Sequence, residues 1–221
     1  MEQELMKTRS LSVSPLDHYE NGELKTKDHT IFSGLAVGQR FFTKSAKHAI
    51  HKIVKSHSLG RDDEAYIVTT SGSPFVSSCV TSTLFNYCKV SRVLTDKTKL
   101  IFVIHEFGFP CEEVQSLYKI ALERGIPLVE DAAHSMTSSY RGQVLGSFGD
   151  YVIHSLPKSL PLDSGGLLIN TSGRFYLNIP EDTRVKNNFL SFEQLLSWTH
   201  NERRRQYLFY QNNLKKKSLY G

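Results

Sequence analysis

Residues 99–131 contain, in order, an apolar run, an amphipathic helix pattern and a second apolar run. Residues 99–105 are almost continuously apolar, as in strands of a parallel sheet covered by helices on both faces. Residues 112–124 place apolar side chains at three- and four-residue spacing, and Gly125 follows where helices commonly end. Strand, helix and strand together make a βαβ unit with a parallel crossover. We therefore expect an α/β protein with a mostly parallel sheet flanked by helices.

The remaining periodic segments are expected to enlarge this domain. Residues 43–57 carry apolar side chains on one helical face and lysines and histidines on the other, and residues 189–214 are expected to form one or two helices. A tight turn is expected at residues 140–143. Further strands are expected at residues 66–68, 151–154 and 166–170. We divide the chain into a polar leader (1–30), an α/β domain (31–175) and a reduced helical C-terminal segment (176–221).

Composition narrows the class of protein. No apolar run approaches the ~20 residues that cross a bilayer, and the acidic start has no apolar signal region. Three cysteines without metal-ligand spacing are typical of free thiols in a reducing cytoplasm. The net charge of +5 comes partly from residues 203–205 and 215–217, which are more typical of a solvated helix face than of a nucleic-acid site. We expect a cytoplasmic protein without a membrane partner, a nucleic-acid partner or a metal.

One acid and one lysine are the candidate functional residues of the chain. Asp131 ends the second apolar strand, and Lys158 follows the strand at residues 151–154. In an open α/β sheet, ligands bind beyond the carboxyl ends of the strands, so both side chains are expected at one edge. Pyridoxal 5'-phosphate (PLP) enzymes need a carboxylate for the ring nitrogen and an amine for the aldehyde. From the pattern alone, Asp131 could equally be a turn residue and Lys158 a surface residue.

The order of these pieces resembles the DegT/DnrJ/EryC1/StrS family of PLP-dependent sugar aminotransferases. The resemblance covers residues 98–170. Residues 97–110 resemble the family strand that ends in a histidine, and residues 125–135 resemble its acid strand. Residues 140–142 and 146–150 resemble the turn that follows, and six residues separate Lys158 from Gly165, as in the family.

The resemblance implies the aspartate aminotransferase fold, fold type I of PLP enzymes. It implies that Lys158 binds the cofactor covalently, that Asp131 pairs with the ring nitrogen, and that His134 lies near the cofactor. The alternative for His134 is a core histidine whose hydrogen bonds are formed within the protein. Ser155, Ser45, Ala46 and Lys47 are candidate phosphate contacts, the last three because a helix start offers free N–H groups. Phe75 is a candidate for stacking on the ring, or a plain core residue.

The activity that follows is amino transfer to a keto sugar, nucleotide-linked, with glutamate as the amino donor and a homodimer as the assembly. The alternative is a non-catalytic homologue that serves as a dimerisation or regulatory partner. Two departures from the family motivate it. The chain is short for the family, and Ala46 stands where the family has a glycine.

Overall fold

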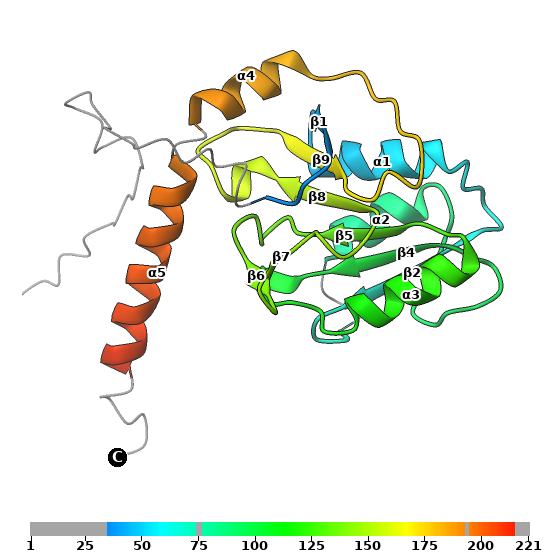
Figure 1. Ribbon diagram of the computed structural model, residues 1–221, viewed down its shortest axis with the longest axis horizontal. Coiled ribbons are helices and arrows are strands. Elements are labelled where there is room, and N and C mark those ends of the chain that lie inside the picture. Colours follow the sequence, from blue (N-terminus) through cyan, green and yellow to red (C-terminus); the bar gives the residue numbers. More distant parts are fainter. Residues whose placement is uncertain (1–34, 74–76, 193–194, 215–221) are drawn as a thin grey trace, which may run out of the picture.

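The computed structural model describes residues 35–73, 77–192 and 195–214. Within them, a seven-stranded sheet has the order β1-β9-β8-β5-β4-β2-β3 (Figure 1). The predicted leader (1–30) and Phe75 lie outside the described residues. The strands of this sheet are β1 (Gln39–Thr43), β2 (Glu64–Thr69), β3 (Lys89–Ser91), β4 (Thr98–Ile104), β5 (Leu128–Asp131), β8 (Tyr151–Ser155) and β9 (Gly166–Asn170).

The centre of the sheet is parallel. Strands β3, β2, β4, β5 and β8 run in one direction, whereas β9 is antiparallel to both β8 and β1. The helix between β4 and β5 is α3 (Val114–Arg124), and together the three elements form the expected βαβ unit. The prediction of an α/β protein with a mostly parallel sheet is confirmed.

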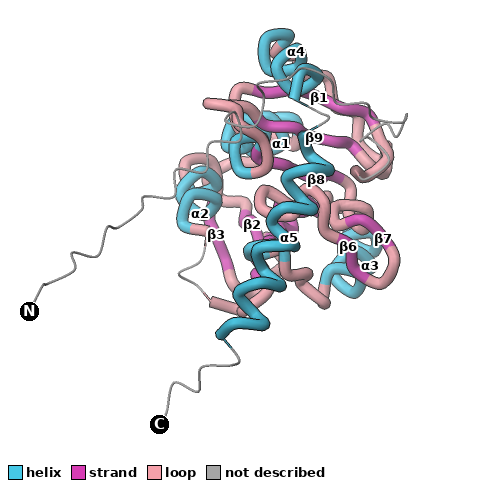
Figure 2. The backbone as a smooth tube through the Cα atoms, turned by 90° about the vertical axis from the view of Figure 1, so that its left-hand side faces the viewer, coloured by secondary structure: helices cyan, strands magenta, loops and turns pink. Residues whose placement is uncertain are grey.

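Helices cover both faces of the sheet (Figure 2). Helix α1 (Ala46–Ser56) and helix α2 (Ser78–Phe85) bury their apolar side chains in one cluster with Val129 and Ile153, and α3 packs in a second cluster with Leu128. Gly125 ends α3 with a φ of 64°, a left-handed conformation that glycine adopts without strain. The predicted helices at 43–57 and 112–124 are therefore present. Helix α1 begins three residues later and ends one residue earlier than predicted, and α3 begins two residues later.

A short hairpin and two 3₁₀ turns lie at the carboxyl edge of the sheet. Strands β6 (Ser139–Tyr140) and β7 (Gln143–Val144) flank Arg141 and Gly142, both with positive φ, which matches the expected tight turn. Turn η3 (Glu106–Gly108) follows β4, and turn η4 (Leu156–Lys158) follows β8.

Two helices complete the described chain. Helix α4 (Thr183–Phe192) packs beside β1, and helix α5 (Leu195–Leu214) begins with buried leucines and then extends away from the sheet (Figure 1). They correspond to the predicted one or two helices at 189–214, although α4 begins earlier. No helix among the described residues has the length and apolar character to cross a membrane.

Candidate active site

A cavity opens at the carboxyl edge of the sheet, where β4 and β5 end in register beside β8. Ile104 of β4 pairs with Asp131 of β5, and Asp131 pairs with Ile153 of β8. Residues that end or follow these strands therefore meet at one place, as expected for an open α/β sheet. The cavity has a volume of about 170 Å³. Its lining comprises Ser77, Cys79, Ile104, His105, Glu106, Phe107, Asp131, Ala133, His134 and Lys158.

Asp131 supplies a buried carboxylate to this cavity. The residue is only 7% exposed, and its Oδ1 accepts a hydrogen bond of 2.8 Å from Ala133 N. Burial raises the pKa of the Asp131 carboxyl, while the Ala133 hydrogen bond, the Lys158 charge and His105 act in the opposite direction. The carboxylate is therefore held in a place where a further positive charge would stabilise it.

Lys158 approaches the same cavity from η4. Its Nζ lies 2.7 Å from Nε2 of His134, and the His134 ring packs against Phe107 with ring centroids 5.5 Å apart. Burial lowers the pKa of His134, and the charges of Lys158 and Arg203 lower it further. A neutral His134 can accept a hydrogen bond from the lysine amine through Nε2. The two predicted residues Asp131 and Lys158 thus line one cavity, together with His134.

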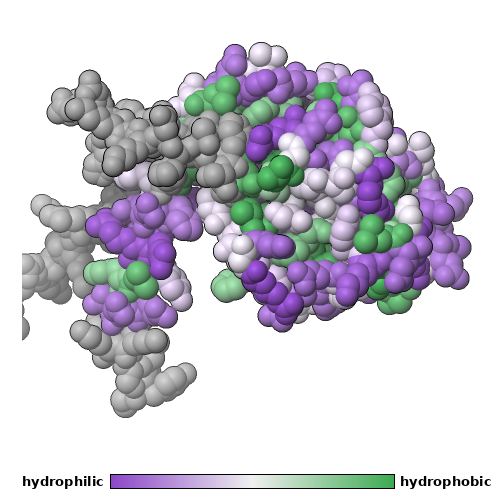
Figure 3. All heavy atoms as spheres, in the orientation of Figure 1, coloured by the Kyte–Doolittle hydropathy of each residue, from purple (hydrophilic) through white to green (hydrophobic). Residues whose placement is uncertain are grey.

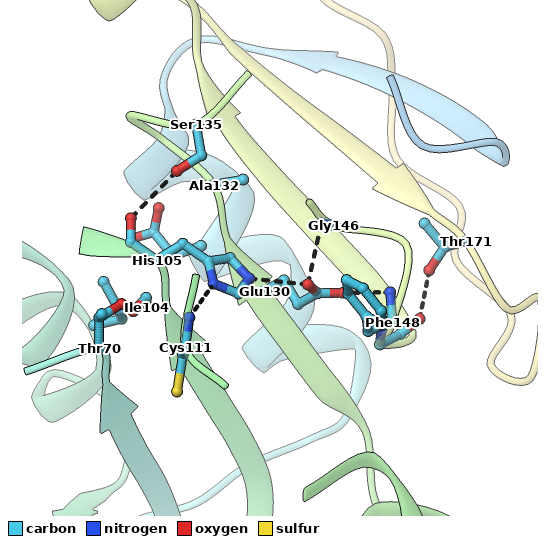
Figure 4. Close-up of polar contacts among 12 residues, drawn as sticks. Thr70, Ile104, His105, Cys111, Glu130, Ala132, Ser135, Gly146, Phe148 and Thr171 are labelled. Atoms are coloured by element: carbon cyan, nitrogen blue, oxygen red, sulfur yellow. Dashed lines mark hydrogen bonds and ion pairs between the residues drawn. The ribbon is translucent and has the colours of Figure 1, made fainter. Parts of the chain in front are cut away.

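A second buried acid, Glu130, connects His105 of the cavity lining to residues 146–149 (Figure 4). Its Oε2 accepts hydrogen bonds from His105 Nε2 at 2.9 Å and Gly146 N at 3.0 Å. Its Oε1 accepts from Phe148 N at 2.8 Å and Gly149 N at 2.7 Å. Since Nδ1 of His105 accepts from a backbone N–H, at 3.0 Å from Cys111, the His105 proton is on Nε2. The network ties the end of β4 to β5 and to residues 146–149.

The predicted phosphate contacts lie elsewhere in the fold. Ser45 caps α1, where its side chain accepts a hydrogen bond of 3.1 Å from His48 N, and its backbone lies against Gly165 and Gly166. Ser155 ends β8 and precedes η4. Of the described residues, Ser45, Ala46, Lys47 and Ser155 are not among those that line the cavity. Their role in phosphate binding stays a prediction.

The structure adds cavity residues that the sequence analysis did not select. Glu106 is 7% exposed and accepts hydrogen bonds from Ser71 N at 3.1 Å and Ser71 Oγ at 3.0 Å. An acidic residue directly after an apolar strand was the available signal for it. Ser77 and Cys79 come from the start of α2, a helix the sequence pattern did not predict. No cluster of metal-binding side chains occurs in the described part of the chain.

PLP, the cofactor that the sequence resemblance implies, fits the residues present. A protonated ring nitrogen would supply the positive charge that the buried Asp131 carboxylate lacks. Lys158 offers a primary amine to the same space. The volume of about 170 Å³ is close to that of a cavity that holds one benzene ring, about 150 Å³. The cavity thus suits one aromatic ring, with any larger ligand extending out of its mouth.

Comparisons with known sequences agree with this geometry. A sequence model of the DegT/DnrJ/EryC1/StrS aminotransferase family matches residues 43–178. The GDP-perosamine synthase of Escherichia coli O157:H7 is 25% identical over 143 residues, which are 58% of this chain and 39% of that protein. An uncharacterized protein of Methanocaldococcus jannaschii is 32% identical over 85 residues, 38% of this chain and 22% of that protein. The chain therefore spans about two fifths or less of these curated relatives.

Solved structures show the same fold. An aminotransferase of this family from Brucella abortus superposes with a TM-score of 0.56 at 15% identity, over 65% of this chain and 44% of that one. DesI with its TDP-sugar product gives a TM-score of 0.54 at 21% identity, over 64% of this chain and 40% of DesI. The predicted fold, the large domain of PLP-dependent aminotransferases, is confirmed.

Proposed function

Because the chain belongs to the DegT/DnrJ/EryC1/StrS aminotransferase family, we propose that it binds PLP and transfers an amino group to a sugar. One observation carries the proposal: Asp131 and Lys158 line a single ring-sized cavity. When bound, the cofactor supplies an aldehyde for the amine and an electron sink for the reacting carbon. The protein supplies the charges and proton carriers around it.

Each of the three central residues has a distinct role. Asp131 pairs with the ring nitrogen and keeps it protonated, which relieves the cost of burying its own charge. Lys158 attaches the cofactor and moves a proton at the reacting carbon. The lysine amine must first lose a proton to react, and the neutral His134 ring 2.7 Å away can accept a hydrogen bond from it.

The substrate is a keto sugar, nucleotide-linked, and glutamate is the amino donor. The names of two relatives support this class, a GDP-perosamine synthase and DesI with its TDP-sugar product. The cavity holds a ring rather than a whole nucleotide-linked sugar, so most of the substrate lies outside it. A cytoplasmic location stays a prediction.

The assembly is a homodimer. Helix α5 extends from the body and carries exposed aromatic and aliphatic side chains after its arginines (Figure 3). The exposed fractions are 63% for Tyr207, 45% for Leu208, 62% for Phe209 and 56% for Tyr210. Four consecutive exposed apolar residues are unusual on a monomer surface and favour contact with a second chain.

A non-catalytic homologue is the second candidate. It is favoured by one observation, that the described candidates for phosphate binding (Ser45, Ala46, Lys47 and Ser155) do not line the cavity. A chain that keeps the fold but holds the cofactor weakly could serve as a dimerisation or regulatory partner.

Reconstitution with PLP separates the candidates. The protein is expected to turn yellow, and borohydride reduction should fix the cofactor mass on the peptide that contains Lys158. Lys158→Ala is expected to lose the visible band, whereas Lys119→Ala, an exposed lysine of α3, should keep it. A colourless wild-type protein would overturn cofactor binding. A yellow protein that no amino acid converts would instead support the non-catalytic candidate.

A further inference from the structure

Three consecutive arginines on α5 have different surroundings, although the sequence presents them as one basic run. Arg205 pairs with Glu202, with Nη2 and Oε1 2.5 Å apart. Arg203 donates a hydrogen bond of 2.8 Å from Nη2 to the carbonyl oxygen of Lys158. Arg204 is exposed and makes no hydrogen bond to the described residues. Arg203 is therefore bonded to a residue that lines the cavity, Lys158.

Helix α5 is fixed at this position by a second contact. His200 Nδ1 lies 2.8 Å from Oγ1 of Thr137, one helical turn before Arg203. Thr137 follows the loop that carries His134, whereas Lys158 is in η4. Helix α5 therefore contacts both segments that carry the basic side of the cavity, and the Arg203 guanidinium is held there.

Charged side chains of both signs surround the cavity. Asp131 and Glu106 place carboxylates in its lining. Lys158 in the lining and Arg203 beside it are the cations, and both lower the pKa of His134, after the larger effect of burial. In the described part of the chain, no carboxylate pairs with Arg203. A negatively charged ligand group beside Lys158 and Arg203 would complement these two cations.

We propose that Arg203 binds a carboxylate of the amino donor at the rim of the cavity. This inference rests on the proposed function, since it concerns the donor for the amine that Lys158 handles. The guanidinium has five N–H donors, and its hydrogen bond to Lys158 uses one of them. The others can form paired hydrogen bonds with a carboxylate, a geometry that the ammonium of lysine does not reproduce.

The test uses the full-length protein loaded with PLP and glutarate, a dicarboxylate that has no amino group to react. Calorimetry measures its affinity for wild type, Arg203→Ala, Arg203→Lys and the matched control Arg204→Ala. Loss of a charge-assisted hydrogen-bond pair is expected to weaken glutarate binding by about 10- to 100-fold in Arg203→Ala. Arg203→Lys should recover part of the loss, and Arg204→Ala should equal wild type. With glutamate, the KM should rise with little change in kcat.

Several results would overturn the proposal. Equal glutarate affinities of Arg203→Ala and Arg204→Ala would do so. The proposal would also be overturned if Arg203→Ala lost affinity for inorganic phosphate alone, because Arg203 would then bind a phosphate group. If the wild-type protein takes up no PLP, the proposed function fails by itself. The same glutarate titration of the cofactor-free variants then still decides whether Arg203 binds carboxylates.

Discussion

Glu130 and Asp131 are adjacent acids on β5, yet their surroundings differ in kind. Successive side chains of a strand point to opposite faces, so the two carboxylates enter different environments. Glu130 is fully buried and accepts four hydrogen bonds, three from backbone N–H groups and one from His105. Asp131 is 7% exposed, accepts one from Ala133 among the described residues, and faces the cavity.

The comparison separates two uses of a buried charge. A carboxylate whose oxygens already accept a complete set of hydrogen bonds gains nothing from a further partner. Its hydrogen bonds stabilise the structure around it. A carboxylate with few donors and open space before it has a raised pKa and favours a cationic ligand. On this basis, we assign Glu130 to the scaffold and, under the proposed function, Asp131 to the site.

The largest effect is expected from Glu130→Gln. The glutamine amide keeps one accepting oxygen, but an N–H₂ group replaces the other. That group faces either His105 or backbone N–H donors, and it cannot accept hydrogen bonds from them. Each donor left unpaired in the interior costs about 1–3 kcal/mol of unfolding free energy, and the N–H₂ group faces two of them. Urea unfolding followed by circular dichroism measures the loss.

The control for Glu130→Gln is Glu123→Gln, at an exposed position of α3, which should stay within about 0.5 kcal/mol of wild type. If both variants unfold at the same urea concentration, the donors around Glu130 do not stabilise the protein. The distinction between the two acids would then be lost.

Much of this arrangement was accessible from the sequence. The apolar runs at 99–105 and 126–131 predicted β4 and β5, and the position of Asp131 at a strand end predicted that it would meet Lys158 at one edge. These predictions hold because hydrophobic periodicity and strand direction are local properties that determine where a strand end lies.

Other parts could not be predicted. Helix α2 has the sequence SCVTSTLF, whose Ser, Thr and Val residues favour helices weakly, so its formation depends on packing against the sheet. The role of Glu130 depends on N–H groups of residues 146–149, far along the chain. The separation of Arg203 from its two neighbours likewise depends on where α5 lies, which the run of arginines does not encode.

A second prediction tests the other acid. Asp131→Asn is expected to weaken PLP binding by about 10- to 100-fold, because the neutral amide cannot balance the charge of a protonated ring nitrogen. Fluorescence or absorbance titration with PLP measures the dissociation constant. Asp96→Asn, at an exposed position, is the control and should bind as wild type does. Equal affinity in Asp131→Asn would mean that the carboxylate does not contact the ring.

The smallest predicted effect is that of Asp131→Asn on the free energy of unfolding, and its sign is opposite to that of Glu130→Gln. Burial raises the pKa of Asp131 in the folded chain above its ordinary value of 3.8, so the folded chain binds this proton more tightly than the unfolded chain does. The contribution of Asp131 to stability is therefore present at low pH and is lost as the pH rises through the raised pKa. At neutral pH, Asp131→Asn should stabilise the cofactor-free protein by about 1 kcal/mol, since it removes a poorly solvated charge. The gain should shrink as the pH falls toward 3.8. Thermal unfolding at several pH values measures it, and an Asp131→Asn protein that is less stable than wild type at neutral pH would show that this acid, like Glu130, serves the scaffold.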